Sequence, residues 1–501
     1  MTNEPNHRSP LVHRVHLTAG SSERRLLEVE SGASASFRDL VAGAASFGAA
    51  LLAQGHIEPG DHVLILAPPG IAWARAFLAV LFAGGAVVAA PLAAPRSELA
   101  YITTDSGARL AIVSNELADE LPAHLSKIDV ASAIEAPPEL PVIDAAAAAL
   151  VLYTSGTTGK PKGAVLTHEN LAAQTSSLRD AWGFAPNDVL LHTLPLHHLH
   201  GVVVAFLTAL TTPAEIHMLA KFDAGTICDE LSRVTVFMAV PTMYRRLLDH
   251  ADALDAGRRD AFERACRGLR LATSGSAALP VTLAERWRTI TGAIPLERYG
   301  MTEIGIALSN PLDPAGRKPG MVGTPLPTVE IRIIAEDGTD TDGPGELWVR
   351  GPSVMKGYLG REEATRASFR DGWFTTGDIA VRDEDGHVRL LGRSSTDILK
   401  TGGEKVSALE IEEVLREHEA IAEVAVVGIP DPMWGDRVVA AIVPKDGAAS
   451  ACTTDLLRAW AKQRLAAYKV PKDFVTMPAL PRNAMGKVLK PDIVRALSQD
   501  N

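Results

Sequence analysis

Short apolar runs alternate with longer helical patterns through most of the first 330 residues. The runs at residues 63–66, 110–113 and 235–238 are typical of buried strands, and helical patterns such as those at 39–54 and 243–250 separate them. Parallel strands need long crossover connections, so this alternation favours central sheets that are covered by helices. We therefore predict an α/β protein whose layers are built on mainly parallel strands.

A different pattern begins near residue 321. Residues 329–333 and 346–350 alternate polar with apolar side chains, and Gly, Pro and Asp residues separate the two runs. Alternation with a period of two, bounded by turn residues, is typical of antiparallel strands that are buried on one face. We expect an antiparallel β segment from about 321 to 392, at the end of a large N-terminal domain that spans residues 1–394.

The last hundred residues change character again. Ser407 is followed three residues later by Glu410, which predicts a capping box at the start of a helix that ends near residue 418. The pattern continues with strands near residues 424–429 and 438–443 and with a helix over 454–466. We expect a small α+β domain over residues 395–501.

The composition excludes several classes of protein. The 501 residues are 47% hydrophobic and 22% charged, which is ordinary for globular domains and unlike disordered, collagen-like or coiled-coil chains. Forty-nine Lys and Arg against 60 Asp and Glu give a net charge of −11, which argues against nucleic-acid or anionic-membrane partners. Residues 437–501 are locally basic, and they form either a solvated face or a surface that meets a polyanion.

The cysteines and the apolar runs predict a cytoplasmic location. Cys228, Cys266 and Cys452 lie far apart, without metal-ligand spacing or a disulfide framework, and this favours a reducing compartment. The first ten residues lack the apolar core of a secretory signal. The longest apolar run, over residues 76–90, is too short to span a bilayer.

A block rich in Gly, Thr and Lys follows the strand-like residues 150–153. Its glycines let backbone N–H groups approach an anion, and its hydroxyls and lysines can hydrogen-bond and neutralise phosphate oxygens. It is not a Walker A loop, because only two residues separate Gly156 from Gly159 and Pro161 follows Lys160. The predicted phosphate ligands are Thr154, Ser155, Gly156, Thr157, Thr158, Gly159, Lys160 and Lys162.

This block resembles the phosphate-binding motif of the adenylate-forming superfamily, which includes acyl-CoA synthetases, luciferases and peptide-synthetase adenylation domains. Four further motifs match in the same order over about residues 30–495: Tyr-Gly-Met-Thr-Glu at 299–303, Gly-Trp-Phe-Thr-Thr-Gly-Asp at 372–378, the stretch 392–409, and Pro-Arg-Asn-Ala-Met-Gly-Lys at 481–487. The resemblance implies that a carboxylate attacks the α-phosphate of ATP and that a thiol then attacks the acyl-adenylate. It also implies ATP, Mg²⁺ and coenzyme A as cofactors.

The resemblance assigns roles within these motifs. Glu303 is implied to hold Mg²⁺, Thr302 to hydrogen-bond the α-phosphate, and Lys487 to reach both the reacting carboxylate and the α-phosphate. The other implied nucleotide contacts are Ser276, Ala277 and Ala278 beside adenine, Tyr299 as a ring that stacks on adenine, its neighbours Gly300 and Met301, and Asp378 and Arg393 at the ribose.

The same resemblance implies that the C-terminal domain rotates between the two steps. Family members commonly carry Asp or Lys at the pivot, whereas this chain has Ser395, so the identity of the hinge residue stays open. Gly402 and Gly403 are implied to line the tunnel for the thiol, and Lys405 is a candidate contact for a CoA phosphate.

The acid is predicted from the residues that correspond to the acyl pocket. His198 matches the residue that gates this pocket in the family, and His200 adds polarity there. Arg246 and Arg298 would suit a substrate with a second carboxylate, which needs a charged and preferably bidentate partner. The open alternative is that each arginine lies at the surface or pairs with a local acid such as Glu297. Met301 is also placed at this pocket.

Residues 296–312 closely resemble malonyl-CoA synthetases. We therefore expect ATP-dependent ligation of malonate, or of methylmalonate, to CoA. The alternatives are a short- or medium-chain fatty acyl-CoA synthetase, a stand-alone adenylation enzyme that loads a carrier protein, and a non-catalytic nucleotide-binding protein on the same fold. The sequence leaves open the choice between malonate and methylmalonate and the oligomeric state.

Overall fold

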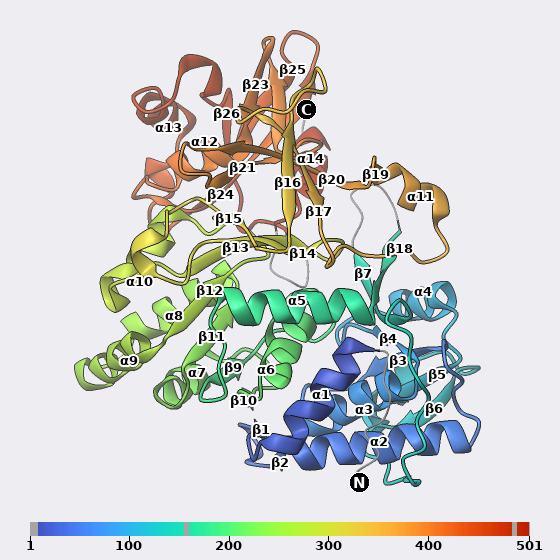
Figure 1. Ribbon diagram of the computed structural model, residues 1–501. Coiled ribbons are helices and arrows are strands. Elements are labelled where there is room, and N and C mark those ends of the chain that lie inside the picture. The colour runs from blue at the N-terminus through green and yellow to red at the C-terminus, as the bar shows by residue number, and fades with distance from the viewer. Residues whose placement is uncertain (1–8, 155–159, 483–487, 500–501) are drawn as a thin grey trace.

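A computed structural model describes residues 9–154, 160–482 and 488–499, and Figure 1 shows their arrangement. Two large sheets and a small β segment form the N-terminal domain, and a smaller α+β domain follows at the C-terminal end. The described part of the chain contains no helix with the length and apolar character needed to cross a membrane.

The first large sheet has seven strands in the order β18-β8-β7-β4-β3-β5-β6. Its inner strands run parallel, as the alternation predicts, and β8 and β18 add an antiparallel edge. The strands are β3 (His62–Leu66), β4 (Ala86–Ala89), β5 (Leu110–Val113), β6 (Ser126–Asp129), β7 (Ala148–Thr154), β8 (Lys162–Thr167) and β18 (Gly357–Tyr358). The helices α2 (Phe37–Ala53), α3 (Ile71–Phe82) and α4 (Arg96–Ser106) connect or flank them.

The second large sheet has nine strands in the order β15-β14-β13-β12-β11-β9-β10-β1-β2. Neighbouring strands run parallel from β1 through β13, and antiparallel pairs close both ends. The strands are β1 (Arg25–Glu28), β2 (Ser34–Ser36), β9 (Val189–His192), β10 (Glu215–Met218), β11 (Val236–Ala239), β12 (Leu271–Ser274), β13 (Leu296–Met301), β14 (Gly305–Ser309) and β15 (Thr324–Pro325).

Helices pack on and between these sheets, with α5 near the centre of the view in Figure 1. They are α1 (Pro10–Ser21), α5 (His168–Ala181), α6 (Thr208–Thr211), α7 (Ala224–Glu230), α8 (Pro241–Asp252), α9 (Ala256–Gly268) and α10 (Val281–Thr291). A buried π-helix (His200–Leu207) precedes α6. One apolar core runs continuously from α1 to the β segment, so the two large sheets fold as a single unit.

The predicted antiparallel segment is confirmed. β16 (Glu330–Ile334) pairs with β17 (Gly345–Arg350), which pairs with β20 (Trp373–Arg382), and β20 also pairs with β21 (Val388–Arg393). The short strand β19 (Phe369–Arg370) lies at the other edge, and the small helix α11 (Glu362–Ala367) precedes it. This sheet matters for function because β20 and β21 bring Asp378 opposite Arg393.

The C-terminal domain has the predicted α+β character, but its helices are shorter than predicted. The first ends at Leu415 and not near residue 418, because the chain tightens into i→i+3 hydrogen bonds there. The second ends at Ala461 and not at 466, again in a turn. The elements are β22 (Ile398–Thr401), β23 (Glu404–Ser407), α12 (Ala408–Leu415), β24 (Ile421–Asp431), β25 (Gly435–Pro444), α13 (Thr454–Ala461), β26 (Asp473–Thr476) and α14 (Lys490–Gln499).

Only one half of the predicted capping box forms at α12. The Ser407 hydroxyl accepts a hydrogen bond from the Glu410 amide at 3.1 Å, as predicted. The Glu410 carboxylate instead pairs with Lys469, 2.6 Å away. A further side chain of this helix crosses to the N-terminal domain, where the Glu413 carboxylate accepts from the Val281 amide at the start of α10 at 2.6 Å.

Candidate active site

The pair predicted to hold ribose is assembled by strand register. Asp378 of β20 lies opposite Arg393 of β21, and Arg393 Nε donates to Asp378 Oδ1 at 3.0 Å. The Tyr299 hydroxyl, from β13, donates to Asp378 Oδ2 at 2.5 Å. Burial and the neighbouring Asp378 raise the pKa of Tyr299 well above its usual value, so the phenol stays a donor. The three side chains form one cluster, in which the Tyr299 hydroxyl orients Asp378, while the stacking of its ring on adenine stays a prediction.

The predicted metal ligand lies in the turn between β13 and β14 (Figure 1). Glu303 is buried, and the Tyr358 hydroxyl donates to its Oε1 at 2.9 Å. Burial raises the pKa of Glu303, while the hydrogen bond from Tyr358 favours its charged form. Thr302 precedes it in the same turn and is half-buried.

The chemistry of this turn fits Mg²⁺. Within the described ranges, no three His, Cys, Asp or Glu side chains gather as a dedicated metal cage. Magnesium is commonly held by one or two carboxylates together with phosphate oxygens, so a single buried carboxylate is a suitable protein ligand. Glu303 is the residue that would hold the ion, next to the phosphates of ATP.

The phosphate loop is described only at its two ends. Ser155, Gly156, Thr157, Thr158, Gly159 and the predicted catalytic Lys487 lie outside the described residues. Thr154 ends β7 and pairs across the hairpin with Lys162, the first residue of β8. The Lys160 ammonium lies 5.5 Å from the centre of the Tyr101 ring, and the Lys162 ammonium lies 4.8 Å from that of Tyr358.

The predicted adenine segment follows the carboxyl end of β12, where parallel sheets commonly bind ligands. Its three predicted contacts are exposed, namely Ser276, Ala277 and Ala278. Ser276 has a φ of +68°, which is unusual for a residue with a side chain. A side chain at Gly275 would displace the Arg298 guanidinium, because a Cβ there would lie 2.2 Å from Arg298 Cζ.

Arg298 is buried, and the described residues give it no acidic partner. It is 4% exposed, and its Nε and Nη2 atoms have no hydrogen-bond partner among the described residues. Its neighbour Glu297 turns the other way on β13 and accepts from the Leu279 amide at 3.0 Å. The alternative of a local ion pair with Glu297 is therefore not realised. Burial lowers the pKa of Arg298 to about 9 and raises that of Glu297 to about 8.

Of the two predicted histidines, His200 belongs to the same cluster, and His198 is two residues before it in the chain. His200 Nδ1 lies 3.4 Å from the Ser276 hydroxyl, and its Nε2 has no partner among the described residues. Burial and the charge of Arg298 lower the pKa of His200 well below its usual value. Burial also lowers the pKa of His198 to about 3, and its ring lies 4.1 Å from that of His197. At neutral pH the histidines are uncharged, and Arg298 supplies the positive charge.

The structure does not bring the other predicted arginine to this cluster. Arg246 lies exposed on α8 with its guanidinium 4.6 Å from the centre of the Phe222 ring. The helical turn that buries Tyr244 directs Arg246 to the exposed side of α8, and its predicted place at the acyl pocket stays a prediction. Gly300 and Met301 end β13 beside Thr302, as the motif predicts.

The residues predicted to meet CoA lie in the C-terminal domain. Gly402 and Gly403 form the turn between β22 and β23 with φ values of +60° and +86°, a conformation that favours glycine. Lys405 pairs with Glu336 of the N-terminal domain. Ser395 is exposed in the turn that follows Arg393.

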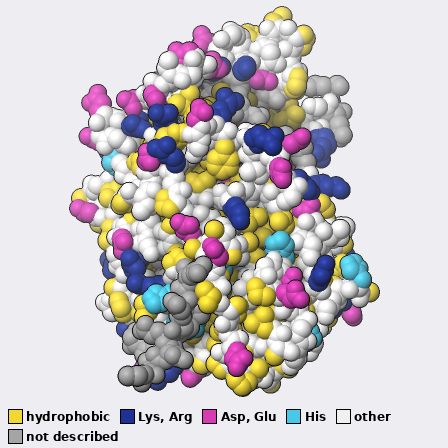
Figure 2. Space-filling view, turned by 45° about the vertical axis from the view of Figure 1, so that its right-hand side comes forward, with side chains coloured by type: hydrophobic (Ala, Val, Ile, Leu, Met, Phe, Trp, Pro, Cys, Tyr) yellow, Lys and Arg dark blue, Asp and Glu magenta, His cyan; other side chains and the backbone are white. Residues whose placement is uncertain are grey.

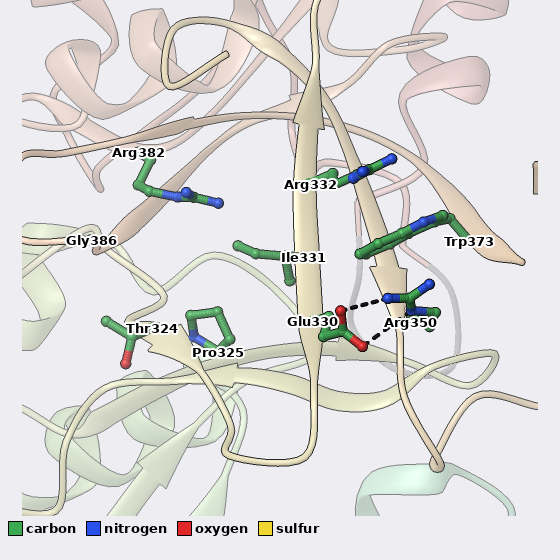
Figure 3. Close-up of a pocket in the computed structure, with 9 residues that line it drawn as sticks. All are labelled: Thr324, Pro325, Glu330, Ile331, Arg332, Arg350, Trp373, Arg382 and Gly386. Atoms are coloured by element: carbon green, nitrogen blue, oxygen red, sulfur yellow. Dashed lines mark hydrogen bonds and ion pairs between the residues drawn. The ribbon is translucent and has the colours of Figure 1, made fainter. Parts of the chain in front are cut away.

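Sequence reasoning missed the tyrosines around the phosphate loop and a cavity on the β segment. The cavity has a volume of about 560 Å³ and lies along β16, where Arg382 reaches toward Ile331 while Glu330 and Arg350 pair beside it (Figure 3). Arg350 also lies 4.4 Å from the centre of the Trp373 ring. No sequence motif marks these contacts, which form only through the register of three strands.

In the face that Figure 2 shows, Lys and Arg are interspersed with Asp and Glu.

Comparisons with known proteins place the chain in a family. Residues 16–359 match the AMP-binding enzyme family, and residues 410–487 match the AMP-binding enzyme C-terminal domain. The chain therefore belongs to the AMP-binding enzymes, and it is an AMP-forming acyl-CoA ligase that uses ATP, Mg²⁺ and CoA.

Its relatives narrow this class. The chain is 42% identical over 480 residues to the mitochondrial malonate–CoA ligase of Mus musculus, covering 87% of this chain and 82% of the relative. ATP-bound MatB from Rhodopseudomonas palustris superposes with a TM-score of 0.90 at 34% identity, covering 98% and 99% of the two chains. A malonyl-CoA ligase in a ternary product complex with methylmalonyl-CoA and AMP gives a TM-score of 0.66 at 39% identity, covering 92% and 97%.

Proposed function

We propose that this enzyme ligates malonate to CoA through a malonyl-adenylate and releases AMP and pyrophosphate. The observation that carries the proposal is Arg298, a buried guanidinium that has no acidic partner among the described residues. A buried charge that stays unpaired is costly, so the site is built for an anion that arrives with the substrate. The distal carboxylate of a dicarboxylate supplies that anion and can accept two parallel hydrogen bonds.

The proposed reaction has two steps, adenylation of the acid and transfer of the acyl group to CoA. One malonate carboxylate oxygen attacks the α-phosphorus of ATP, and the bond to the bridging oxygen breaks as pyrophosphate leaves. Thr302 and Lys487 would contact the α-phosphate, and Glu303 would hold Mg²⁺, whose charge offsets that of the phosphates. The CoA thiol then gives up its proton and attacks the acyl carbon, and AMP leaves.

The two steps need different arrangements of the C-terminal domain. We propose a boundary between residues 394 and 395, with the pivot at Ser395. The ATP-bound relative superposes better than the product complex, with TM-scores of 0.90 and 0.66, although the product complex is closer in sequence. This supports an arrangement suited to adenylation here. Rotation would then bring Gly402, Gly403 and Lys405 to the thiol.

The runner-up is a short- or medium-chain fatty acyl-CoA synthetase. An alkyl chain in this pocket would leave Arg298 without a partner, so the geometry favours a dicarboxylate. Two further alternatives are a carrier protein in place of CoA as the thiol acceptor and methylmalonate in place of malonate as the acid. The substrate panel described next tests both. One methyl group is worth only about 1–3 kcal/mol in a pocket.

The first test is a substrate panel. The purified enzyme with ATP, Mg²⁺ and CoA should release AMP fastest with malonate or methylmalonate, and more slowly with acetate, octanoate or benzoate. Replacing CoA with a phosphopantetheinylated carrier protein tests the alternative acceptor. Faster turnover of a monocarboxylate would overturn the proposal.

The second test removes the charge. Arg298→Gln should raise the KM for malonate by about 30-fold or more, because a charged hydrogen-bonded pair is worth several kcal/mol, and should change the KM for ATP little. Arg246→Gln is the matched control, since that arginine is exposed on α8. An equal loss of ATP and malonate binding would remove the assigned role.

We also propose a cytoplasmic location. Its support is chemical: the three cysteines are free, and Cys266 and Cys452 are buried. Fractionation of the source cells with an antibody against the chain tests it, and recovery in an organelle or an extracellular fraction would contradict it.

A further inference from the structure

One helix contacts both chain segments that emerge from the phosphate loop. The Tyr153 hydroxyl, one residue before the predicted phosphate ligands begin, donates to Asp105 Oδ2 at 2.9 Å. The Tyr101 hydroxyl donates to the Pro161 carbonyl at 2.7 Å, directly after Lys160. Tyr101 and Asp105 belong to successive turns of α4 and share one face of it. We infer that they are positioning residues that fix the two ends of the loop for ATP.

Asp105 is held from a third side. Its Oδ1 pairs with Arg361 Nη2, so both carboxylate oxygens have donors. The Asp105 side chain is 8% exposed, and a carboxylate buried to that extent needs such partners. Arg361 follows β18, which pairs with β8 on the other side of the hairpin. The Asp105 carboxylate therefore joins three parts of the chain: α4, the end of β7 and the segment that follows β18.

The rings add a second set of contacts. Tyr101 and Tyr153 meet edge to face, with ring centres 6.3 Å apart. Gly163 leaves space for the Tyr153 ring, because a Cβ there would lie 3.3 Å from Tyr153 Cζ and 2.8 Å from a methyl of Val151. The face of Tyr101 lies 5.5 Å from the Lys160 ammonium, a cation–π distance. Tyr101 thus contacts Lys160 with its ring and the next residue with its hydroxyl.

These contacts can fix the positions of the two ends of the loop before ATP binds. Thr154 and Lys162 pair with each other at the base of the predicted loop, and the contacts of α4 lie beside these two residues. An anion site built from loop donors binds well when its geometry is set before the ligand arrives, because less ordering is then needed on binding. Clamping both ends to α4 supplies this order without any direct contact with ATP.

The inference rests on the proposed role of the loop in ATP binding and is specific to that ligand. The cluster of Arg298 and His200 is built on β13 and the π-helix, and among the described residues none of its hydrogen bonds involves α4. Loss of the clamp should therefore weaken ATP and pyrophosphate and leave malonate unchanged. A merely structural role would affect both substrates through the folded fraction.

The experiment compares three isosteric variants. Tyr101→Phe and Tyr153→Phe each remove one hydroxyl and keep the ring. Thr103→Val is the matched control, because Thr103 is buried in the same helix and its hydroxyl donates only within α4, to the Leu99 carbonyl at 2.8 Å. Each phenylalanine variant should raise the Kd for ATP and the KM for pyrophosphate about 2- to 10-fold, the effect of one hydrogen bond.

The readouts separate this inference from the proposed function. ATP binding is measured by calorimetry without any acid, and malonate dependence is measured by pyrophosphate exchange at saturating ATP. If the native enzyme does not bind ATP, the proposed function fails. If it binds ATP and both phenylalanine variants bind it equally well, the clamp is refuted. A parallel rise in the KM for malonate, or the same rise in Thr103→Val, also refutes it. A variant that unfolds is replaced by Asp105→Asn, which keeps the size of the side chain.

Discussion

Glu297 and Arg298 are consecutive residues of β13, and the pleat of the strand directs them to opposite sides. Charge pairing between sequence neighbours is a natural expectation, but the strand geometry prevents it here. The motif singled out Arg298, which the structure shows to be buried, while its role at the acyl pocket stays a prediction. The sequence could not reveal that Arg246 is exposed, because the direction of a helical side chain depends on which face of α8 packs inward. It also could not reveal the contact of Tyr299 with Asp378, which needs the register of β20.

The buried Glu297 predicts a dependence of stability on pH. Burial raises its pKa to about 8 in the folded protein, from an ordinary value near 4.5. The folded state then holds a proton that the unfolded chain releases, so this contribution is complete below about pH 4.5 and is lost as the pH rises through about 8. Glu297→Gln should remove the loss and gain about 2–3 kcal/mol over the native enzyme between pH 5.5 and 8.

Urea unfolding of both proteins at the two pH values measures this difference. Gln keeps an acceptor for the Leu279 amide, so the hydrogen bond is preserved. Glu417→Gln, at an exposed position, serves as the control and should show no such gain. A stability difference that stays constant from pH 5.5 to 8 would mean that Glu297 is charged in the folded state.

At the scale of elements, the apolar pattern predicts the centres of the strands and helices well and their ends less well. β5 coincides with the predicted run at residues 110–113, because four buried residues between polar neighbours define it. Helix ends depend on local turns and on contacts from elsewhere. The first helix of the C-terminal domain stops at Leu415, and the carboxylate of Glu410 pairs with Lys469, 59 residues away in the sequence.

Helix α5 offers a test at this scale. Its capping box is complete, with Thr167 Oγ1 accepting from the Asn170 amide at 3.1 Å and Asn170 Oδ1 accepting from the Thr167 amide at 2.9 Å. Gln174 on the same helix accepts from the Ile306 amide at 2.6 Å, behind the Glu303 turn. Thr167→Ala should lower the free energy of unfolding by about 1 kcal/mol.

Equilibrium unfolding in urea checks this value. Thr104→Ala is the control, because Thr104 is exposed in α4, where alanine is a good helix former. If both substitutions have the same effect on stability, the cap is not what stabilises the start of α5.

At the scale of the whole molecule, the order of the motifs predicts a large N-terminal domain and a small C-terminal one, and this division is confirmed. The position of the boundary after residue 394 stays a prediction. The sequence contains the motifs for both catalytic steps, whichever step the domain arrangement suits. They carry no information about which orientation of the C-terminal domain the chain adopts.

The hinge gives a prediction that separates the two steps. Ser395→Pro fixes φ at the proposed pivot and restricts Ser394 as well. Adenylation, measured by pyrophosphate exchange, should stay within about 3-fold of the native rate, because the present arrangement suits it. The CoA-dependent step should fall by about 100-fold, because it needs rotation.

Ser395→Ala is the control, since alanine leaves the pivot free to turn and both steps should proceed normally. The two rates are measured separately, by pyrophosphate exchange without CoA and by single-turnover transfer from preformed adenylate. An equal loss of both steps in Ser395→Pro would place the pivot elsewhere.

The hydrogen bond that the Val281 amide donates to the Glu413 carboxylate joins the C-terminal domain to the start of α10. Val281 begins α10 three residues after Ala278, where the predicted adenine segment ends, so the contact with the C-terminal domain and the predicted nucleotide contacts share one short stretch of chain. Any free energy by which ATP favours the closed arrangement must appear in equal measure as tighter ATP binding by the closed enzyme.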